Sequence, residues 1–406
     1  MTDNNNDASS SRRKFILTAG AGLVATGVTI AAQRALSDEA APPQTPSKVT
    51  IKAQYRKLGR TGKLVSKIGV GTASLSTPAV LDHAIDLGLN YIDTAHCYMD
   101  GRSEKTLGKI LKRRRDEVVL TTKWHPGPTA TKKQMLNSLD TSLRRLNCDH
   151  VDCVLVHSVK SVDRIQNPEV FEAFHAAKKA GKVSHLGMSS HSPAMIEVIR
   201  EAIRLKLYDV VLLKYSYMAY PEVGKLIDEL YAANIGVTVM KTRDGARHTS
   251  LEAFNQDDGF VASALRWASS NPKIASTVIS ANSFDDINLF ARVAGQAVTQ
   301  RDLKTLDQYA RRFDQIQCRW CGDCGPACPA DVPVWEVDRA AMYFDRYNEE
   351  RRGMNLYAAM KSPASACITC SAPCEDACSH KLPIRNQMME AHDLLAPTHR
   401  PELDLG

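Results

Sequence analysis

Short apolar runs alternate with amphipathic helical stretches through the middle of the chain, and this alternation constrains the fold more than any other feature. The stretches between the runs, such as TPAVLDHAIDLG and TKKQMLNSLDTSLRRL, carry apolar residues at helical spacing. The strands that this pattern predicts cover residues 67–72, 90–95, 118–124, 151–158, 183–190, 210–216, 236–242 and 275–281.

Eight strands, each followed by a helix, predict an α/β fold and favour a closed (β/α)8 TIM barrel over an open sheet. The barrel is expected to occupy residues 46–300, close to the roughly 250 residues that this fold takes. Before the first strand, YRKLGRTGKLV predicts a hairpin with Gly59 and Gly62 as its turn residues. In such a barrel, the chemistry is expected at the C-terminal ends of the strands.

Four polar residues fall at the ends of three consecutive predicted strands. Asp93 lies at the end of the second strand, with Tyr98 five residues later, while Lys123 and His157 lie at the ends of the third and fourth. Each residue alone has an ordinary explanation, as a helix cap, a packed aromatic, a solvated lysine or a core histidine. All four at matching strand ends are instead expected to converge on one wall of the barrel mouth.

This grouping predicts a site for acid catalysis. A tyrosine, with an ordinary pKa of about 10, is a poor proton donor at neutral pH. A nearby lysine ammonium is expected to lower the pKa of Tyr98, while Asp93 keeps Lys123 charged. A neutral His157 would hydrogen-bond and orient a substrate carbonyl. Such a site would reduce a carbonyl or oxidise the alcohol in reverse.

The segments GLNYIDTAHCYMDGRSE, LTTKW, VLVHS, GKVSHLGMSSHS and YRKLGRTG resemble the aldo/keto reductases, over about residues 53–295. The resemblance implies that the catalytic tetrad of the family falls on Asp93, Tyr98, Lys123 and His157. It also implies NAD(P)H bound in an extended pose across the barrel mouth.

The cofactor side departs from the family pattern. The family has Ser-Asn after the fifth strand, whereas this chain has Ser189 and Ser190. Lys241 aligns where the family often stacks an aromatic ring on the nicotinamide, although Arg243 could still take a pyrophosphate. An acidic pair at residues 285–286 stands in the segment where the family holds a 2′-phosphate with Lys or Arg. These departures leave the use of NAD(P)H open.

Two cysteine runs follow the predicted barrel, and both continue alike, as CPADVPV and CSHKLPI. The first run, CRWCGDCGPACP, has the spacing of a [4Fe–4S] motif, and eight thiolates can hold two such clusters. With the fourth ligand exchanged between runs, as in two-cluster ferredoxins, Cys378 joins the first set and Cys328 the second. The expected ligands are Cys318, Cys321, Cys324, Cys328, Cys367, Cys370, Cys374 and Cys378.

The second run has one extra residue, and Ser379 replaces the proline, so a [3Fe–4S] cluster is the alternative at that site. Zinc and a disulfide framework are alternatives for both runs. The long insert between the runs looks helical. Residues 301–406 are therefore expected to form a small, mainly helical ferredoxin-like iron–sulfur domain.

The first 45 residues have the features of an export signal and linker. Ser11-Arg12-Arg13-Lys14-Phe15 precedes a weakly apolar segment and a Pro-rich stretch, and the paired arginines resemble the twin-arginine (Tat) signal. The apolar segment is too short and too rich in Gly and Thr for a stable membrane span. We therefore expect export of the folded protein by the Tat translocon to the periplasm, with its clusters already inserted.

The composition of the 406-residue chain is that of an ordinary globular protein, with 44% hydrophobic and 24% charged residues. The net charge of +7 is spread along the chain, without interleaved aromatics, which argues against a nucleic-acid partner. The chain resembles the aldo/keto reductases that carry a C-terminal ferredoxin-like domain, which implies a small carbonyl or alcohol substrate and an electron-transfer partner.

Three functions follow from these features. The first is an oxidoreductase that exchanges electrons between a carbonyl or alcohol and two [4Fe–4S] clusters, with NAD(P)H as a further candidate cofactor. The second is a nicotinamide-independent exported electron-transfer protein. The third is a non-catalytic barrel whose clusters are structural.

Overall fold

Eight parallel strands close into a barrel whose hydrogen-bonded order is β10-β3-β4-β5-β6-β7-β8-β9, as the (β/α)8 prediction requires. The structure is a computed structural model that describes residues 53–396, apart from residues 128, 220 and 244–258. The barrel strands are β3 (Ile68–Gly71), β4 (Tyr91–Asp93), β5 (Val119–Trp124), β6 (Val151–Val156), β7 (Val183–Ser190), β8 (Val210–Lys214), β9 (Gly236–Met240) and β10 (Ser276–Ser280).

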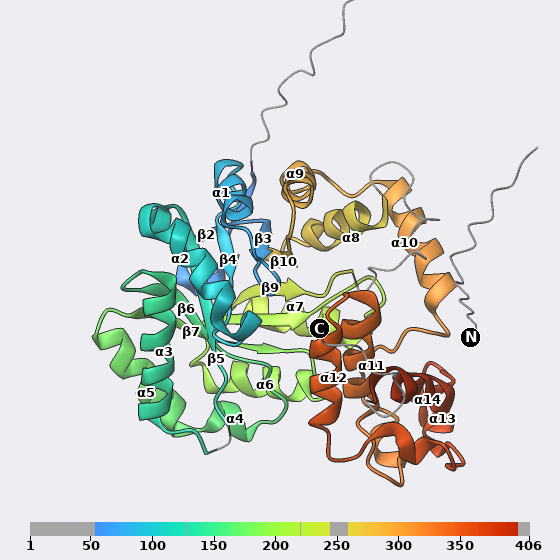
Figure 1. Ribbon diagram of the computed structural model, residues 1–406. Coiled ribbons are helices and arrows are strands. Elements are labelled where there is room, and N and C mark those ends of the chain that lie inside the picture. The colour runs from blue at the N-terminus through green and yellow to red at the C-terminus, as the bar shows by residue number, and fades with distance from the viewer. Residues whose placement is uncertain (1–52, 128, 220, 244–258, 397–406) are drawn as a thin grey trace, which may run out of the picture. The chain divides into compact units, whose positions relative to one another are not determined.

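Helices surround these strands (Figure 1), and the predicted eightfold alternation is confirmed. Their apolar faces pack on the strands in the largest core cluster of the described residues. The helices and helical turns of the barrel are α1 (Pro78–Asp86), η2 (Tyr98–Gly101), α2 (Arg102–Arg114), η3 (Arg115–Glu117), α3 (Lys132–Leu146), α4 (Asp163–Gln166), α5 (Pro168–Lys179), α6 (Met195–Leu205), α7 (Pro221–Ala232), α8 (Gly259–Ser270) and α9 (Phe284–Val293).

The predicted hairpin closes the N-terminal end of the barrel. Strands β1 (Tyr55–Lys57) and β2 (Leu64–Ser66) pair antiparallel around the turn η1 (Gly59–Thr61). Leu58 is fully buried with the interior residues of the barrel, and Arg60 donates to the Tyr208 carbonyl at 2.8 Å, just before β8. Only the opposite end of the barrel, where the strands have their carboxyl ends, is left for a site.

Helix α10 (Gln300–Phe313) packs against α8 of the barrel. Arg266 of α8 forms a buried ion pair with Asp302 of α10 at 2.6 Å, and Asp302 also completes a capping box with Thr299. The expected domain boundary at residue 300 falls at the start of this helix. The helix therefore continues the barrel layer before the chain enters the cysteine-rich segment.

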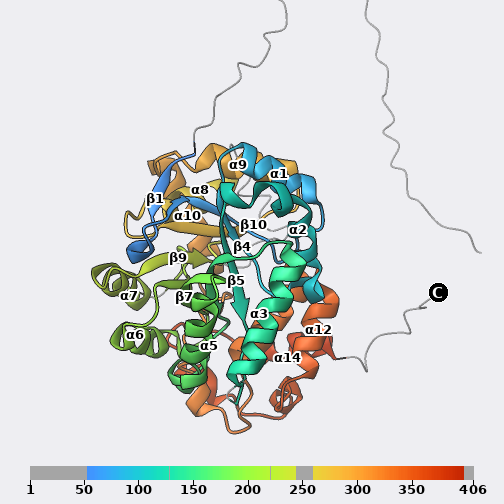
Figure 2. The same ribbon diagram turned by 90° about the vertical axis from the view of Figure 1, so that its left-hand side faces the viewer.

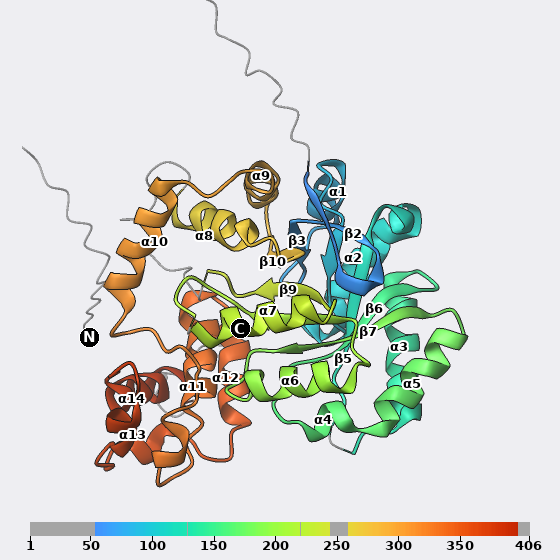
Figure 3. The ribbon, with the colours of Figure 1, turned by 180° about the vertical axis from the view of Figure 1, so that it is seen from behind.

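The described residues after α10 are mainly helical (Figures 2 and 3), as expected for the cysteine-rich domain. Its core contains Val337, Phe344 and Met388 beside the cysteines. Gly353 lets α12 approach α11 closely, because a Cβ there would lie 2.6 Å from the Ala340 carbonyl oxygen. Its helices and turns are η5 (Gly325–Ala327), α11 (Val334–Ala341), η6 (Met342–Arg346), α12 (Glu350–Ala358), η7 (Ala364–Cys367), α13 (Pro373–Ala377) and α14 (Ile384–Leu395).

The expected signal segment, residues 1–45 with Arg12 and Arg13, lies outside the described residues. Everything described belongs to one unit, Thr50–Gly406. Within the described ranges, no helix has both the length and the hydropathy that a membrane crossing needs.

Candidate active site at the barrel mouth

The structure brings the four strand-end residues together at the carboxyl ends of β4, β5 and β6. Lys123 of β5 is fully buried and donates to Asp93 Oδ1 at 2.5 Å and to the Thr94 carbonyl at 2.7 Å. Its Nζ also lies 3.4 Å from the Tyr98 hydroxyl. The ring of His157, which directly follows β6, meets the Tyr98 ring edge to face, with centroids 5.8 Å apart.

Burial decides the protonation of these groups. Burial raises the pKa of Tyr98 to about 12, and the Lys123 ammonium offsets only part of this effect. The expectation that Lys123 brings the pKa of Tyr98 below its ordinary value is therefore wrong. The phenol stays neutral over the physiological range and presents its proton as a hydrogen-bond donor.

The protonation of Lys123 and His157 is compatible with a neutral Tyr98 as the proton donor. Burial lowers the pKa of Lys123, but Asp93 and Tyr98 more than offset this, so its net pKa is raised and the ammonium is kept. Burial and the Lys123 charge hold the pKa of His157 well below its usual range, so its ring is neutral. The site can thus donate a proton from Tyr98 and a hydrogen bond from a neutral imidazole.

Two further histidines, which sequence reasoning did not assign a place there, and a thiol stand at the same mouth. His125 lies 5.5 Å from His157 between ring centroids, and His96 Nδ1 lies 2.9 Å from the Lys123 carbonyl oxygen. The exposed Cys97 places its Sγ 3.6 Å from His157 Nδ1. Their positions next to Tyr98 and Lys123 in the sequence were the available signal.

The two serines expected to contact the cofactor form hydrogen bonds with the backbone of this chain. Ser189 Oγ accepts from the Ser158 backbone N–H at 2.9 Å, and Ser190 Oγ donates to the Val159 carbonyl at 2.8 Å. Both hydroxyls are buried and hold the loop after β6. Lys241 directly follows β9 with a left-handed φ of 59°, and Arg243 lies two residues farther on.

The C-terminal domain covers this side of the mouth. Lys241 Nζ lies 5.3 Å from the ring centroids of both Trp320 and Tyr343. Lys214, at the end of β8, lies 4.3 Å from the Trp320 ring and donates to the Arg319 carbonyl at 3.1 Å. No local pattern in the sequence predicted this cover.

The first cysteine run also abuts the barrel. Gly322 has φ 91°, and a Cβ there would lie 2.5 Å from the Cβ of Pro193, in the loop after β7. Trp320 has φ 61°, which is costly for a bulky residue, and only 3% of it is exposed. Its indole N–H donates to Asp338 at 2.7 Å, so the ring is held between the cysteine loop and the barrel.

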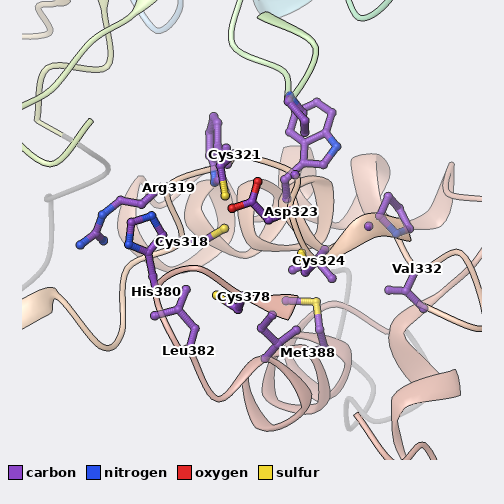
Figure 4. A pocket seen from close by; sticks show the side chains of 18 of the residues that line it. Cys318, Arg319, Cys321, Asp323, Cys324, Val332, Cys378, His380, Leu382 and Met388 are labelled. Atoms are coloured by element: carbon purple, nitrogen blue, oxygen red, sulfur yellow. The ribbon is translucent and has the colours of Figure 1, made fainter. Parts of the chain in front are cut away.

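Four cysteines of the expected first set line one cavity of about 290 Å³ (Figure 4). Cys318, Cys321 and Cys324 come from the first run, and Cys378 comes from the second. This is the exchanged grouping, and the cavity fits a group larger than a single ion. Across the described part of the chain, no three Cys, His, Asp or Glu side chains converge closely enough for one metal ion.

The second set also groups as the exchange rule expects. Burial raises the pKa of Cys367 and of Cys374, and the nearby thiols of Cys328 and Cys370 raise both further, which places the four cysteines close together. Backbone N–H groups point at two sulfur atoms of this set, because Val332 donates to Cys328 Sγ at 3.3 Å and Ala372 to Cys370 Sγ at 3.4 Å. All of the cysteines are free thiols, so the disulfide alternative finds no support.

Comparison with known proteins agrees with this division. Residues 67–261 match the aldo/keto reductase family, and residues 317–382 match the 4Fe-4S dicluster domain. The uncharacterized oxidoreductase YqkF of Bacillus subtilis is 25% identical over 300 residues, which cover 63% of this chain and 96% of that protein. The L-glyceraldehyde 3-phosphate reductase of Escherichia coli is 27% identical over 280 residues, covering 62% and 80%.

A solved structure shares the barrel fold. The aldo-keto reductase AKR11C1 from Bacillus halodurans, in its holo form, superposes with a TM-score of 0.55 at 24% identity. The match covers 63% of this chain and 96% of that one. These matches make the chain an oxidoreductase whose barrel resembles the aldo/keto reductases and is followed by a segment that matches the 4Fe-4S dicluster domain.

Proposed function

We propose that the barrel mouth reduces a carbonyl compound, or oxidises the alcohol in reverse, at Tyr98, Lys123, His157 and Asp93. Tyr98 gives its proton to the carbonyl oxygen, and Lys123 stabilises the phenolate that remains. Neutral His157 holds the same oxygen by a hydrogen bond, while Asp93 keeps Lys123 charged. The contacts that link Asp93, Lys123 and Tyr98 support this proposal.

We propose further that the electrons are exchanged with two [4Fe–4S] clusters. One observation carries this choice: Lys241, which aligns with the nicotinamide-stacking position, is covered by Trp320 and Tyr343. The hydroxyls of Ser189 and Ser190 are also bonded to the chain itself. NAD(P)H, which the family commonly uses, would have to displace these contacts.

The residues that would hold the clusters form two sets of four cysteines. When bound, [4Fe–4S] clusters would supply single electrons, and two of them match the two electrons of carbonyl reduction. The reduction also takes up two protons: Tyr98 gives one to the carbonyl oxygen, and water gives the other to the carbon. The first set lines the cavity that Trp320 also lines. The sets are Cys318, Cys321, Cys324 and Cys378, and Cys328, Cys367, Cys370 and Cys374.

Trp320 links the cysteine cavity to the barrel mouth. It lies between two ligands of the first set, and its ring also contacts Lys214, Lys241 and His191. The ring is 3% exposed where the two places meet. We assign it the role of electronic contact between the first cluster and the mouth.

The experiment that tests the cofactor set is anaerobic purification followed by iron, sulfide and nucleotide analysis. We expect about eight irons per chain and no bound NAD(P)H. Zinc in place of iron would overturn the cluster assignment. Stoichiometric NADPH would show instead that the cover of Lys241 opens and that nicotinamide is the donor.

We also propose that the folded protein leaves the cytoplasm by the twin-arginine route and works in the periplasm with an electron-transfer partner. Arg12 and Arg13 support this proposal. Replacing both with lysine is expected to leave cluster-loaded protein in the cytoplasm, as cell fractionation would measure. Unchanged export would overturn the proposed route.

A further inference from the structure

Three cations surround one phenol where the C-terminal domain covers the barrel mouth. The Arg352 guanidinium lies 3.8 Å from the Tyr343 ring centroid, and Lys241 Nζ lies 5.3 Å from it on the barrel side. The charge of Arg339 acts on the same phenol. Tyr343 lies in the π-helical turn η6, a type of irregularity that is frequent at functional sites.

The acidic partners of these cations do not balance them. Arg352 pairs with Glu349 at 2.6 Å, whereas Arg339 comes no closer to Glu336 than 3.8 Å. Arg339 is 9% exposed, and its Nε has no hydrogen-bond partner. In the described ranges, no carboxylate lies within ion-pair distance of Lys241.

A buried cation without a carboxylate partner costs free energy unless an anion binds it. The left-handed backbone of Lys241 adds strain at the same point, and such strain is typical of binding sites. Burial raises the pKa of Tyr343, but Lys241, Arg352 and Arg339 more than offset this and bring it to about 8. The local potential is therefore strongly positive.

Arg352 connects this positive region to the tetrad. Its charge contributes to the lowered pKa of His157 and opposes the raised pKa of Tyr98. The Arg352 side chain is 38% exposed, so Arg352 faces solvent as well as Tyr343. Lys241 is also only partly buried, so both cations are open to an anion from solvent.

We propose that Lys241 and Arg352 bind an anionic group of the substrate, a carboxylate or a phosphate, while its carbonyl or hydroxyl faces Tyr98 and His157. The substrate class is then an oxo or hydroxy acid, or a phosphorylated carbonyl compound. Arg352 belongs to the C-terminal domain, so that domain contributes to substrate selection as well as holding the clusters. This inference rests on the proposed carbonyl chemistry and deepens it.

The test is calorimetric titration of the anaerobic, full-length holoprotein with oxalate, inorganic phosphate and uncharged oxamide. We expect saturable binding of at least one anion and none of oxamide, and the better anion distinguishes carboxylate from phosphate. Lys241→Gln and Arg352→Gln should each weaken binding about 10- to 100-fold, as expected for a hydrogen bond to a charged group. Arg351→Gln, at the exposed neighbouring position, should leave binding unchanged.

The affinity should also fall between pH 7 and pH 9. Tyr343, which faces Lys241, Arg352, Arg339 and Glu349, then gains negative charge beside the anion.

The inference is overturned if neither anion binds, if oxamide binds as well, if Arg351→Gln causes the same loss, or if binding tightens at pH 9. The iron content of each variant checks its fold, and Arg352→Gln carries the test if Lys241→Gln loses iron. Binding needs no electrons, so these outcomes are separate from any failure of the iron and nucleotide analysis.

Discussion

On one side of the barrel mouth, after β4, β5 and β6, the polar side chains bond to one another. On the other side, after β7, β8 and β9, they bond to loop backbone or face the C-terminal domain. The contact between Lys123 and Tyr98 represents the first arrangement, and the cover of Lys241 by Trp320 and Tyr343 the second. Under the proposed function, the difference assigns proton chemistry and electron supply to separate parts of the chain, so each can be broken alone.

Removing a cluster ligand should have the largest effect, a loss of iron, and should leave the Tyr98 and Lys123 site intact. Cys318→Ala is expected to lower the iron content from about eight to about four per chain, because it removes one ligand of the first set. The exchanged ligand Cys378 links both sets, so the C-terminal domain should also loosen. Iron analysis and limited proteolysis measure both effects. Cys148→Ala is the matched control, and equal iron in both variants would refute the ligand assignment.

Removing the proton donor should leave the clusters in place. Tyr98→Phe deletes one hydroxyl and is expected to lower the carbonyl reduction rate about 10²–10⁴-fold, the usual worth of general acid catalysis. Tyr231→Phe, at an exposed position on α7, is the control. Steady-state rates and iron content are measured together. Full activity in Tyr98→Phe would mean that the tetrad does not act in catalysis.

Breaking the buried ion pair should cost stability as well as activity. Lys123→Met leaves Asp93 buried without its partner and should reduce the free energy of unfolding by about 3–5 kcal/mol. The double variant Lys123→Met/Asp93→Leu should recover much of this loss while staying inactive. Thermal unfolding followed by circular dichroism measures the difference. A single variant as stable as the parent would show that the pair is not buried in solution.

The smallest effect concerns Tyr343 on the covered side. Its folded pKa of about 8 lies below its ordinary value, so its ionisation favours the folded state. This contribution, about 1–3 kcal/mol, is present above pH 10 and is lost as the pH falls through about 8. Ultraviolet difference absorbance should show one phenol ionising near pH 8, absent in Tyr343→Phe and kept in Tyr208→Phe. If no phenol of the parent protein ionises near pH 8, the evidence for a positive electrostatic potential at the barrel mouth is lost.

The barrel and the positions of the tetrad could be predicted because both depend on patterns among residues that are close together in the sequence. Strand and helix periodicity is written in neighbouring residues, and the carboxyl ends of parallel strands share one end of a barrel, which places Asp93, Lys123 and His157 together. The grouping of Cys378 with the first run followed from a repeat that the sequence displays.

The rest depends on contacts between distant segments. Nothing near Lys241 in the sequence indicates that Trp320 and Tyr343 cover it, and nothing near Cys318 indicates that its loop abuts Pro193. The direction of the pKa of Tyr98 was mispredicted because it is the sum of burial and a lysine charge, and burial is a property of the whole fold.

The most direct test of the account follows the clusters themselves. The holoprotein is reduced with dithionite, freed of excess reductant, and mixed without oxygen or nucleotide with a panel of oxo acids, phosphorylated carbonyl compounds and neutral ketones. The account predicts that an anionic carbonyl compound reoxidises the clusters, seen as recovery of their visible absorbance, and that Tyr98→Phe slows this at least about 10²-fold. Clusters that stay reduced while NADPH supports reduction of the same compound would contradict it.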